Sequence, residues 1–261
     1  GRELVCETGR TGPNAVMQFS TYAGIFRLSY GGYMGLGEGY LAGDWSTPSL
    51  RTVFQFGIVN QASLKRSLSG KEPARALRKV LKLVRRNSRS GSRRNIAYHY
   101  DLGNDFYRLW LDPTMTYSSG IYEAPKATLE DAQIAKYRRI VECLDIQPHH
   151  RVLEIDGQAM IQVITVPDER FDGYRRKSDF IQRYIFPGGM LLSPGEMERQ
   201  SGAAALAIDE AFYFGKSYGR TLDRWHDRFI ESWPEIESQG FDDRFRRLWS
   251  YYLNYTAAGF H

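Results

Sequence analysis

Residues 98–123 read YHYDLGNDFYRLWLDPTMTYSSGIYE, and the rest of the chain is most easily understood from this stretch. Apolar residues recur at near-helical spacing over residues 101–111, which predicts a helix there. Asp112-Pro113 ends this helix, because proline disfavours helical geometry in the residue before it. The Tyr-Ser-Ser-Gly run at residues 117–120 predicts a loop whose hydroxyls and backbone N–H groups can face a polar ligand. An aromatic-rich surface turn is the alternative.

Length and composition limit the classes to which the chain can belong. Its 261 residues can hold two domains or one large domain with a substantial core, and its net charge is +5. Cys6 and Cys143 lie far apart and offer neither a disulfide framework nor the spacing of a metal site. No apolar run reaches the roughly 18 residues of a transmembrane helix, and no signal-peptide pattern begins the chain. We therefore expect a cytoplasmic protein that holds no metal and touches membranes only peripherally.

A basic stretch separates the N-terminal part from the rest of the chain. Residues 65–94 contain twelve Lys and Arg but a single acidic residue, Glu72. After Pro73, which can begin a helix, apolar residues fall on one helical face and basic residues cover much of the remainder. Such a helix can lie on an anionic bilayer, which is the interpretation we favour over a solvated helix. Nucleic acid is disfavoured because no base-reading motif accompanies the charge. NSRSGSRR at residues 87–94 predicts a flexible linker and domain boundary.

Other stretches predict regular structure. The glycine-rich residues 31–45 permit positive φ and close backbone approach, but they lack the strand-then-helix context of a dinucleotide loop. Residues 128–144 predict a helix with Thr128 as its N-cap, and RVLEI at residues 151–155 has the pattern of a short buried strand. Residues 214–260 predict two helices, which are separated at the Trp-Pro pair that they contain.

Residues 99–123 resemble the signature of the cyclopropane-fatty-acyl-phospholipid synthases and the related mycolic acid methyltransferases. The resemblance covers most of the chain from about Gly31 onward. Other motifs agree in the same order: GLGEGYLAGDW (35–45), RVLEI (151–155), DFIQRYIFPGG (179–189), FGKSYGRTLDRWHDRF (214–229) and RFRRLWSYYLNYTAAGF (244–260).

The resemblance implies an α/β fold, with a Rossmann-type class I methyltransferase domain over residues 91–261. Residues 1–90 would form a small, mainly helical N-terminal domain that binds lipid and helps to build a homodimer. The chain departs from the family directly after Ile155, where a glycine-rich turn should cradle the cofactor. Roughly 100 residues, a small domain's worth of sheet and helix, are missing between Ile155 and Asp156. Either a segment is omitted there or the protein is a deleted, inactive form, and the intact flanking motifs favour omission.

The chemistry implied by the resemblance is transfer of a methylene group from S-adenosylmethionine to the double bond of an unsaturated acyl chain. The protein must hold the alkene in line with the sulfonium methyl group in a dry pocket. Aromatic faces can stabilise the carbocation that attack creates. In the family, a bicarbonate ion held by a Cys, a Glu, a His and a Tyr removes a proton from the delivered methyl group.

The family's site residues carry over only in part. The Tyr falls on Tyr218, Ser119 stands at the Cys position, Ile164 stands at the His position, and the Glu belongs to the missing segment. Since isoleucine cannot bind an anion, the bicarbonate site is incomplete. We predict Tyr218 and Ser119 as residues of the catalytic pocket.

Cofactor contacts are predicted for Tyr100, Tyr117 and Ser118, whose hydroxyl groups can meet the carboxylate of S-adenosylmethionine or cap its charge. Three functions stay open: a cyclopropane synthase, an acyl methyltransferase that leaves a methylated or methylene-bearing unsaturated chain, and a non-catalytic protein that binds anionic lipid. The expected partners are an unsaturated acyl substrate and the anionic phospholipid surface at the inner face of the membrane.

Overall fold

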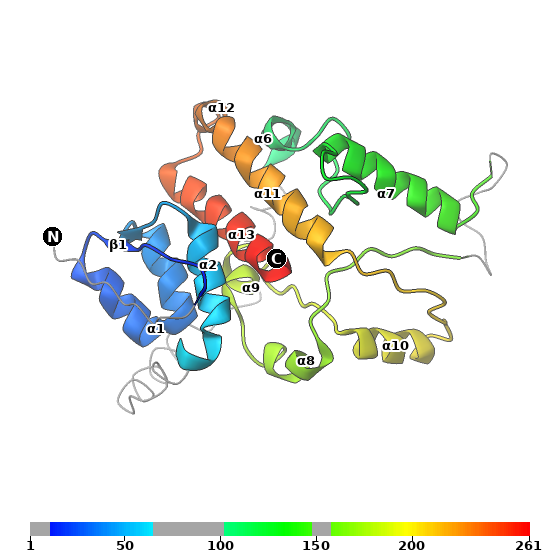
Figure 1. Cartoon of the computed structure of the whole chain (residues 1–261), viewed down its shortest axis with the longest axis horizontal. Helices are drawn as coiled ribbons and strands as arrows, with labels where there is room; N and C mark the ends of the chain where they lie inside the picture. Colours follow the sequence, from blue (N-terminus) through cyan, green and yellow to red (C-terminus); the bar gives the residue numbers. More distant parts are fainter. Residues whose placement is uncertain (1–10, 65–101, 148–157) are drawn as a thin grey trace. The chain divides into compact units, whose positions relative to one another are not determined.

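The structure is a computed structural model that describes residues 11–64, 102–147 and 158–261 (Figure 1). The predicted basic helix, the strand at residues 151–155 and the junction after Ile155 lie outside these ranges. The chain divides into two compact units, which are Gly1–Arg86 with Asp243–Gly259 and Asn87–Asp242 with Phe260–His261. None of the helices within the described ranges has the length and apolarity that a membrane crossing requires.

The first unit is mainly helical. Its elements are β1 (Gln18–Phe19), α1 (Tyr22–Leu41), β2 (Trp45–Ser46), α2 (Leu50–Val59) and most of α13 (Asp243–Phe260). The two short strands pair in antiparallel fashion, with Gln18 opposite Ser46. The side chain of Ser49 caps α2 by accepting a hydrogen bond from the backbone N–H of Thr52.

The glycine-rich stretch lies mostly in α1, which bends at Gly32, where φ is +56°. Beyond the bend, the backbone at Gly35 passes so close to the first half of the helix that a Cβ atom would lie 1.8 Å from the carbonyl oxygen of Arg27. The predicted close approach and positive φ are therefore confirmed. The indole of Trp45 secures the end of this segment by donating a hydrogen bond to the carbonyl oxygen of Leu36, at 2.8 Å.

Aromatic side chains join α13 to the N-terminal helices. The ring of Tyr251, which is buried, lies 4.9 Å from that of Phe54 and 5.9 Å from that of Tyr40. Burial raises the pKa of the Tyr251 phenol above its ordinary value. These contacts explain why most of α13 groups with the first unit, whereas the sequence interpretation placed all of residues 91–261 in one domain.

The second unit holds the helices around the signature stretch. They are α6 (Gly103–Trp110), α7 (Leu129–Cys143), α8 (Asp168–Tyr174), α9 (Phe180–Tyr184), α10 (Pro194–Ala203), α11 (Gly215–Glu231) and α12 (Trp233–Ser238). The helices predicted at residues 101–111 and 128–144 correspond to α6 and α7. The break before Pro234 is also present, but residues 214–260 form three helices instead of two.

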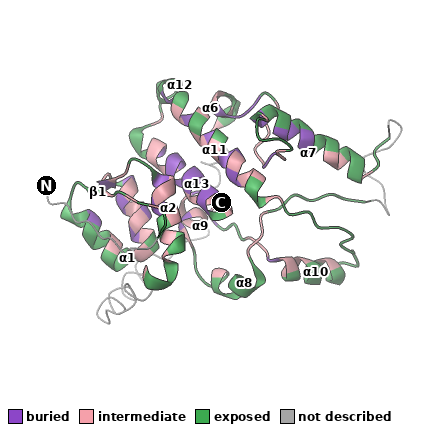
Figure 2. Ribbon diagram, viewed as in Figure 1, coloured by how far each residue is buried: buried purple, intermediate pink, exposed green. Residues whose placement is uncertain are grey.

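The core of this unit lies where α11 packs against α6, as Figure 1 shows. Leu222, Trp225 and Phe229 recur at helical spacing on one face of α11, and each is at most 1% exposed. Phe106 and Trp110 of α6 are fully buried against this face. Figure 2 colours the buried segments of the chain, including those of α11, purple. Each such side chain contributes about 1.5–3 kcal/mol through burial.

Strand structure is sparse in the second unit. Among the described residues, it is limited to one parallel bridge between Thr165 and Leu192. Residues 158–166 therefore pair with other described backbone only at their end, where Thr165 and Val166 meet Leu192. A strand is stabilised by its neighbours across the ladder, and the segment expected to supply those neighbours is the one missing after Ile155.

We predict that Thr128→Ala lowers the free energy of unfolding by about 1 kcal/mol, because it removes the N-cap of α7. The Thr128 hydroxyl accepts a hydrogen bond from the backbone N–H of Asp131, whose carboxylate in turn accepts one from the backbone N–H of Thr128. Urea denaturation followed by circular dichroism measures the change. Thr128→Ser, which keeps the hydroxyl, is the control, and equal midpoints for all three proteins would contradict the prediction.

Candidate functional site

The Tyr-Ser-Ser-Gly loop at residues 117–120 is held by its main chain between α7 and α11. On one side, the side-chain amide of Gln133 donates a hydrogen bond to the carbonyl oxygen of Ser118, at 2.8 Å. On the other, the backbone N–H of Gly120 donates to the hydroxyl of Thr221, at 3.2 Å. Two helices far apart in the sequence thus fix the backbone of the loop, and its side chains are presented from a defined position.

Gly120 lies in contact with α7. A Cβ atom at this position would be 2.7 Å from the Cβ of Ala132 and 3.0 Å from its carbonyl carbon. The next residue, Ile121, donates its backbone N–H to the carbonyl oxygen of Ala132, at 2.9 Å. Only glycine fits this contact without moving the loop or the helix.

Tyr117 belongs to an aromatic cluster. Its ring centre lies 5.1 Å from that of Trp225, 5.5 Å from that of Tyr107 and 5.6 Å from that of Trp110. The cluster gathers several aromatic rings in one place, and an accessible ring face attracts a positive charge. Tyr117 is half-buried, so the cluster reaches the surface of the unit.

Tyr218 joins the same cluster from α11. Its ring centre lies 6.3 Å from that of Trp225 and 4.8 Å from that of Phe260. The ring of Trp225 therefore contacts the rings of both Tyr117 and Tyr218. The structure brings together these two predicted site residues, which are about 100 positions apart in the sequence.

The hydroxyl of Ser118 accepts a hydrogen bond from the ammonium group of Lys136, at 2.7 Å. Lys136 is only 4% exposed, and burial lowers the pKa of its ammonium group to about 8, while the nearby Asp112 carboxylate acts in the opposite direction. Asp112 itself is buried, and its Oδ2 accepts a hydrogen bond from the backbone N–H of Thr114. A charged donor therefore lies directly behind the predicted cofactor residue Ser118.

Ser119 is buried and faces its own backbone. Its hydroxyl donates to the carbonyl oxygen of Gly120, at 2.9 Å, and its carbonyl oxygen accepts from the side-chain amide of Gln162, at 3.1 Å. Ile164, at the position of the family His, is half-buried in the extended segment that follows Gln162. Tyr100, the remaining predicted cofactor residue, lies outside the described residues.

Buried polar atoms near the loop point to a missing neighbour. Oδ1 of Asp112, Oε1 of Gln133 and Nε1 of Trp225 are all buried and make no hydrogen bond to any part of the chain that the structure describes. Such atoms usually have a partner in a complete fold. Their partners are therefore expected in a ligand or in chain segments outside the described ranges.

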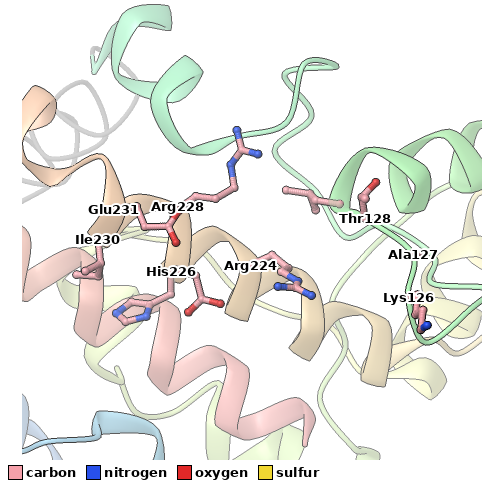
Figure 3. Close-up of a pocket in the computed structure, with 10 residues that line it drawn as sticks. Lys126, Ala127, Thr128, Arg224, His226, Arg228, Ile230 and Glu231 are labelled. Carbon is pink, nitrogen blue, oxygen red and sulfur yellow. The ribbon is translucent and has the colours of Figure 1, made fainter.

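A separate cavity of about 590 Å³ lies between the start of α7 and one face of α11 (Figure 3). It contains none of the predicted site residues. Both signs of charge line it, so it shows no clear preference for a charged ligand; the lining includes Lys126, Arg224, Asp227 and Glu231. Within the described ranges, His, Cys, Asp and Glu side chains form no group that could hold a metal ion.

The sequence interpretation missed the residues that support the loop from behind, above all Gln133 and Lys136. The helical spacing of buried residues in α7 is the sequence signal that could have identified them. Gln133 and Lys136 are three residues apart, and they fall on the same buried face as Leu129, Ala132 and Ala135. Polar side chains on an apolar helix face need a partner, which here is Ser118.

Comparison with known proteins gives consistent matches. Residues 87–157 and 149–261 match the family model described as mycolic acid cyclopropane synthetase. The tuberculostearic acid methyltransferase of Mycobacterium tuberculosis is 28% identical over 90% of this chain and 77% of its own length. The cyclopropane-fatty-acyl-phospholipid synthase of Escherichia coli is also 28% identical, over 90% of this chain and 81% of its own length. A solved mycolic acid cyclopropane synthase complexed with SAH and CTAB is 20% identical, covering 64% of this chain and 92% of that chain with a TM-score of 0.45.

The same matches measure what the chain lacks. The alignment with the M. tuberculosis relative runs over 336 positions, whereas 90% of 261 residues is about 235, so about 100 positions hold no residue of this chain. The family model also matches in two pieces, which meet at residues 149–157. Both findings agree with the expected gap after Ile155.

We predict that Gly120→Ala destabilises the second unit by about 1–3 kcal/mol, because the added methyl group overlaps Ala132. Gly173→Ala is the matched control, since a Cβ at Gly173 in α8 meets no atom within 4 Å. Alanine there should be neutral or slightly stabilising. Thermal unfolding of the two variants measures the difference, and a Gly120→Ala protein as stable as the control would show that the loop does not need this contact.

Proposed function

Because the chain belongs to the mycolic acid cyclopropane synthetase family, we propose that it transfers a methylene group from S-adenosylmethionine to the double bond of an unsaturated fatty acyl chain in a membrane phospholipid. The predicted family, its α/β fold class and S-adenosylmethionine-dependent enzyme activity follow from this membership. Phospholipid as the acceptor is supported by the name of the E. coli relative.

One observation carries the proposal for the site. Trp225 lies in contact with Tyr117 of the loop and with Tyr218 of α11, so one predicted cofactor residue and the predicted catalytic tyrosine belong to one aromatic cluster. We place the reacting groups beside this cluster, with Tyr117 and Ser118 towards the cofactor and Tyr218 towards the acyl chain. Residues 91–261 are proposed as the catalytic domain and residues 1–90 as the lipid-binding domain, with most of α13 packed on the N-terminal helices.

The residues present fit a sulfonium cofactor. When bound, S-adenosylmethionine supplies an electrophilic methyl group that the alkene attacks, with the C–S electron pair leaving on sulfur. The ring face of the half-buried Tyr117 suits its positive charge, and the Ser118 hydroxyl, backed by Lys136, suits its carboxylate. This chain supplies one wall of the site, and the glycine-rich wall would belong to the segment missing after Ile155.

The same cluster suits the acyl substrate. Buried rings exclude water, so that the carbocation formed on the acyl chain is not captured by it. Aromatic faces stabilise this cation without reacting with it. The phenol of Tyr218, half-buried beside Trp225, is proposed to hold the base that removes the proton needed for ring closure.

We propose that bicarbonate is not held in the manner of the family. The hydroxyl of Ser119 donates to its neighbour's carbonyl oxygen, so it is not directed at an anion. Ile164 offers no polar atom in place of the family His. Of the family's four bicarbonate contacts, this leaves Tyr218 on the described residues.

For the cellular context, we propose peripheral association with the anionic inner face of the membrane, in the cytoplasm, as a homodimer. Residues 65–94 contain twelve basic residues and one acidic residue, and this positive charge supports contact with an anionic membrane surface. The same stretch would bring the active site to lipid acyl chains without crossing the bilayer.

We predict that Tyr218→Phe lowers turnover at least about tenfold, since one hydroxyl that acts on the transition state is lost. Unfolding should change by less than about 1 kcal/mol, because the aromatic packing is kept. Tyr213→Phe is the control, because Tyr213 is exposed and belongs to no ring contact among the described residues. Methyl transfer from labelled S-adenosylmethionine gives the rates, and an unchanged rate in a folded Tyr218→Phe protein removes Tyr218 from the site.

We predict that lipids from cells producing the protein contain acyl chains heavier by one methylene that do not take up hydrogen over a mild catalyst. A cyclopropane ring survives this treatment, whereas a methylene-bearing or methylated unsaturated chain is reduced. Mass spectrometry before and after hydrogenation separates the two products. Cells carrying an empty vector are the control. If the heavier chains take up hydrogen, they retain a double bond, and the enzyme methylates the acyl chain without closing a ring.

A further inference from the structure

Lys136 is the polar group of the second unit whose position calls most for an explanation. It lies on the buried face of α7 and is 4% exposed, and its ammonium group reaches the hydroxyl of Ser118 at 2.7 Å. One turn earlier on the same face, Gln133 donates to the carbonyl oxygen of Ser118. Two side chains of one helix thus hold the same serine, one by its backbone and one by its hydroxyl.

The direction of the hydrogen bond decides what Ser118 can do. A hydroxyl has one donor hydrogen and two acceptor lone pairs, and an ammonium group can only donate. The lysine therefore occupies a lone pair of Ser118 and leaves the hydroxyl hydrogen for another acceptor. Within the described part of the chain, the structure shows no acceptor for that hydrogen, so it is available to a ligand.

Other charged or titratable groups surround Lys136 asymmetrically. The carboxylate of Asp112 faces it from the turn after α6, and the ring of Tyr137 lies 5.2 Å from its nitrogen on α7 itself. From α11, Arg228 donates to the carbonyl oxygen of Leu111, next to Asp112, at 2.6 Å. Oδ1 of Asp112 keeps no hydrogen-bond partner among the described residues, so Lys136 is not drawn away from Ser118 into a direct ion pair.

We propose that Lys136 is a positioning residue for the cofactor: its ammonium group holds the Ser118 hydroxyl so that the hydroxyl hydrogen is donated to the carboxylate of S-adenosylmethionine. This inference rests on the proposed function, because it takes the bound ligand to be that cofactor. Lys136 acts through Ser118, and its positive charge adds attraction for the carboxylate in a buried setting.

The arrangement makes cofactor binding depend on pH. Burial lowers the pKa of Lys136 to about 8, so the charged form that donates to Ser118 is present below that pH. Above it, the neutral amine can accept the hydroxyl hydrogen, and Ser118 no longer offers it to the ligand. Affinity for the cofactor is thus retained below about pH 8 and falls as the pH rises through this value.

The test is calorimetric titration of the full chain with S-adenosylhomocysteine, which cannot react, between about pH 6.5 and about pH 9.5, a range that also covers titration of an α-amino group. Wild type should lose about tenfold in affinity across this range. Lys136→Arg keeps a permanent charge and should lose less. Because the ligand's own amino group titrates equally in both experiments, the difference between the two profiles reports Lys136.

Two further variants protect the test against misfolding. Lys136→Met should bind about tenfold more weakly than wild type at neutral pH. Its affinity should then change with pH only through the ligand's own amino group. Ser118→Ala leaves the lysine in place but removes the hydroxyl through which it acts, so it should lose less affinity with rising pH than wild type. This variant decides the matter if Lys136→Met does not fold. Circular dichroism checks each protein.

The outcomes separate the inference from the function on which it rests. Wild-type protein that binds S-adenosylhomocysteine at no pH would overturn the proposed function for this chain. Binding with identical pH profiles for wild type, Lys136→Arg and Ser118→Ala would overturn the role of Lys136 alone. A steeper loss for wild type than for both variants supports the inference.

Discussion

The second unit depends on one constraint, which is that a short loop of four residues is fastened by its main chain to two helices. The side-chain amide of Gln133, in α7, donates a hydrogen bond to the carbonyl oxygen of Ser118. The hydroxyl of Thr221, in α11, accepts one from the backbone N–H of Gly120. The close contact between Gly120 and Ala132 sets how near the loop and α7 can lie. With the backbone fixed in this way, the ring of Tyr117 lies 5.1 Å from that of Trp225 and belongs to the aromatic cluster.

Local signals predicted much of the helical structure. The apolar spacing of residues 101–111 and the cap at Thr128 depend on neighbours within a few turns, and the structure has both. The grouping of α13 with the N-terminal helices was not predictable in this way. It depends on contacts such as that between Tyr251 and Phe54, which are almost 200 positions apart.

The candidate site shows the same division between local and distant information. Tyr117, Ser118 and Tyr218 were available from sequence motifs, and the structure adds that one indole joins the two tyrosines. Lys136 and Gln133 were missed, since their function depends on which residue lies opposite α7. The sheet is the part that the chain leaves most incomplete. Helices form from contacts within one segment, whereas the lone bridge at Thr165 has no set of neighbouring strands to extend it.

The way the loop is fastened also bears on how such a site changes in evolution. At Ser119, the side-chain amide of Gln162 donates a hydrogen bond to the backbone carbonyl oxygen, and this contact does not involve the Ser119 side chain. The hydroxyl of Ser119 could therefore be replaced by a thiol during evolution without losing the hydrogen bond that holds the loop backbone. Position 120 has no comparable latitude, because any side chain there would strike α7. Adjacent residues of one loop thus meet different spatial constraints: the backbone contact at Ser119 does not depend on its side chain, whereas the contact at Gly120 leaves no room for one.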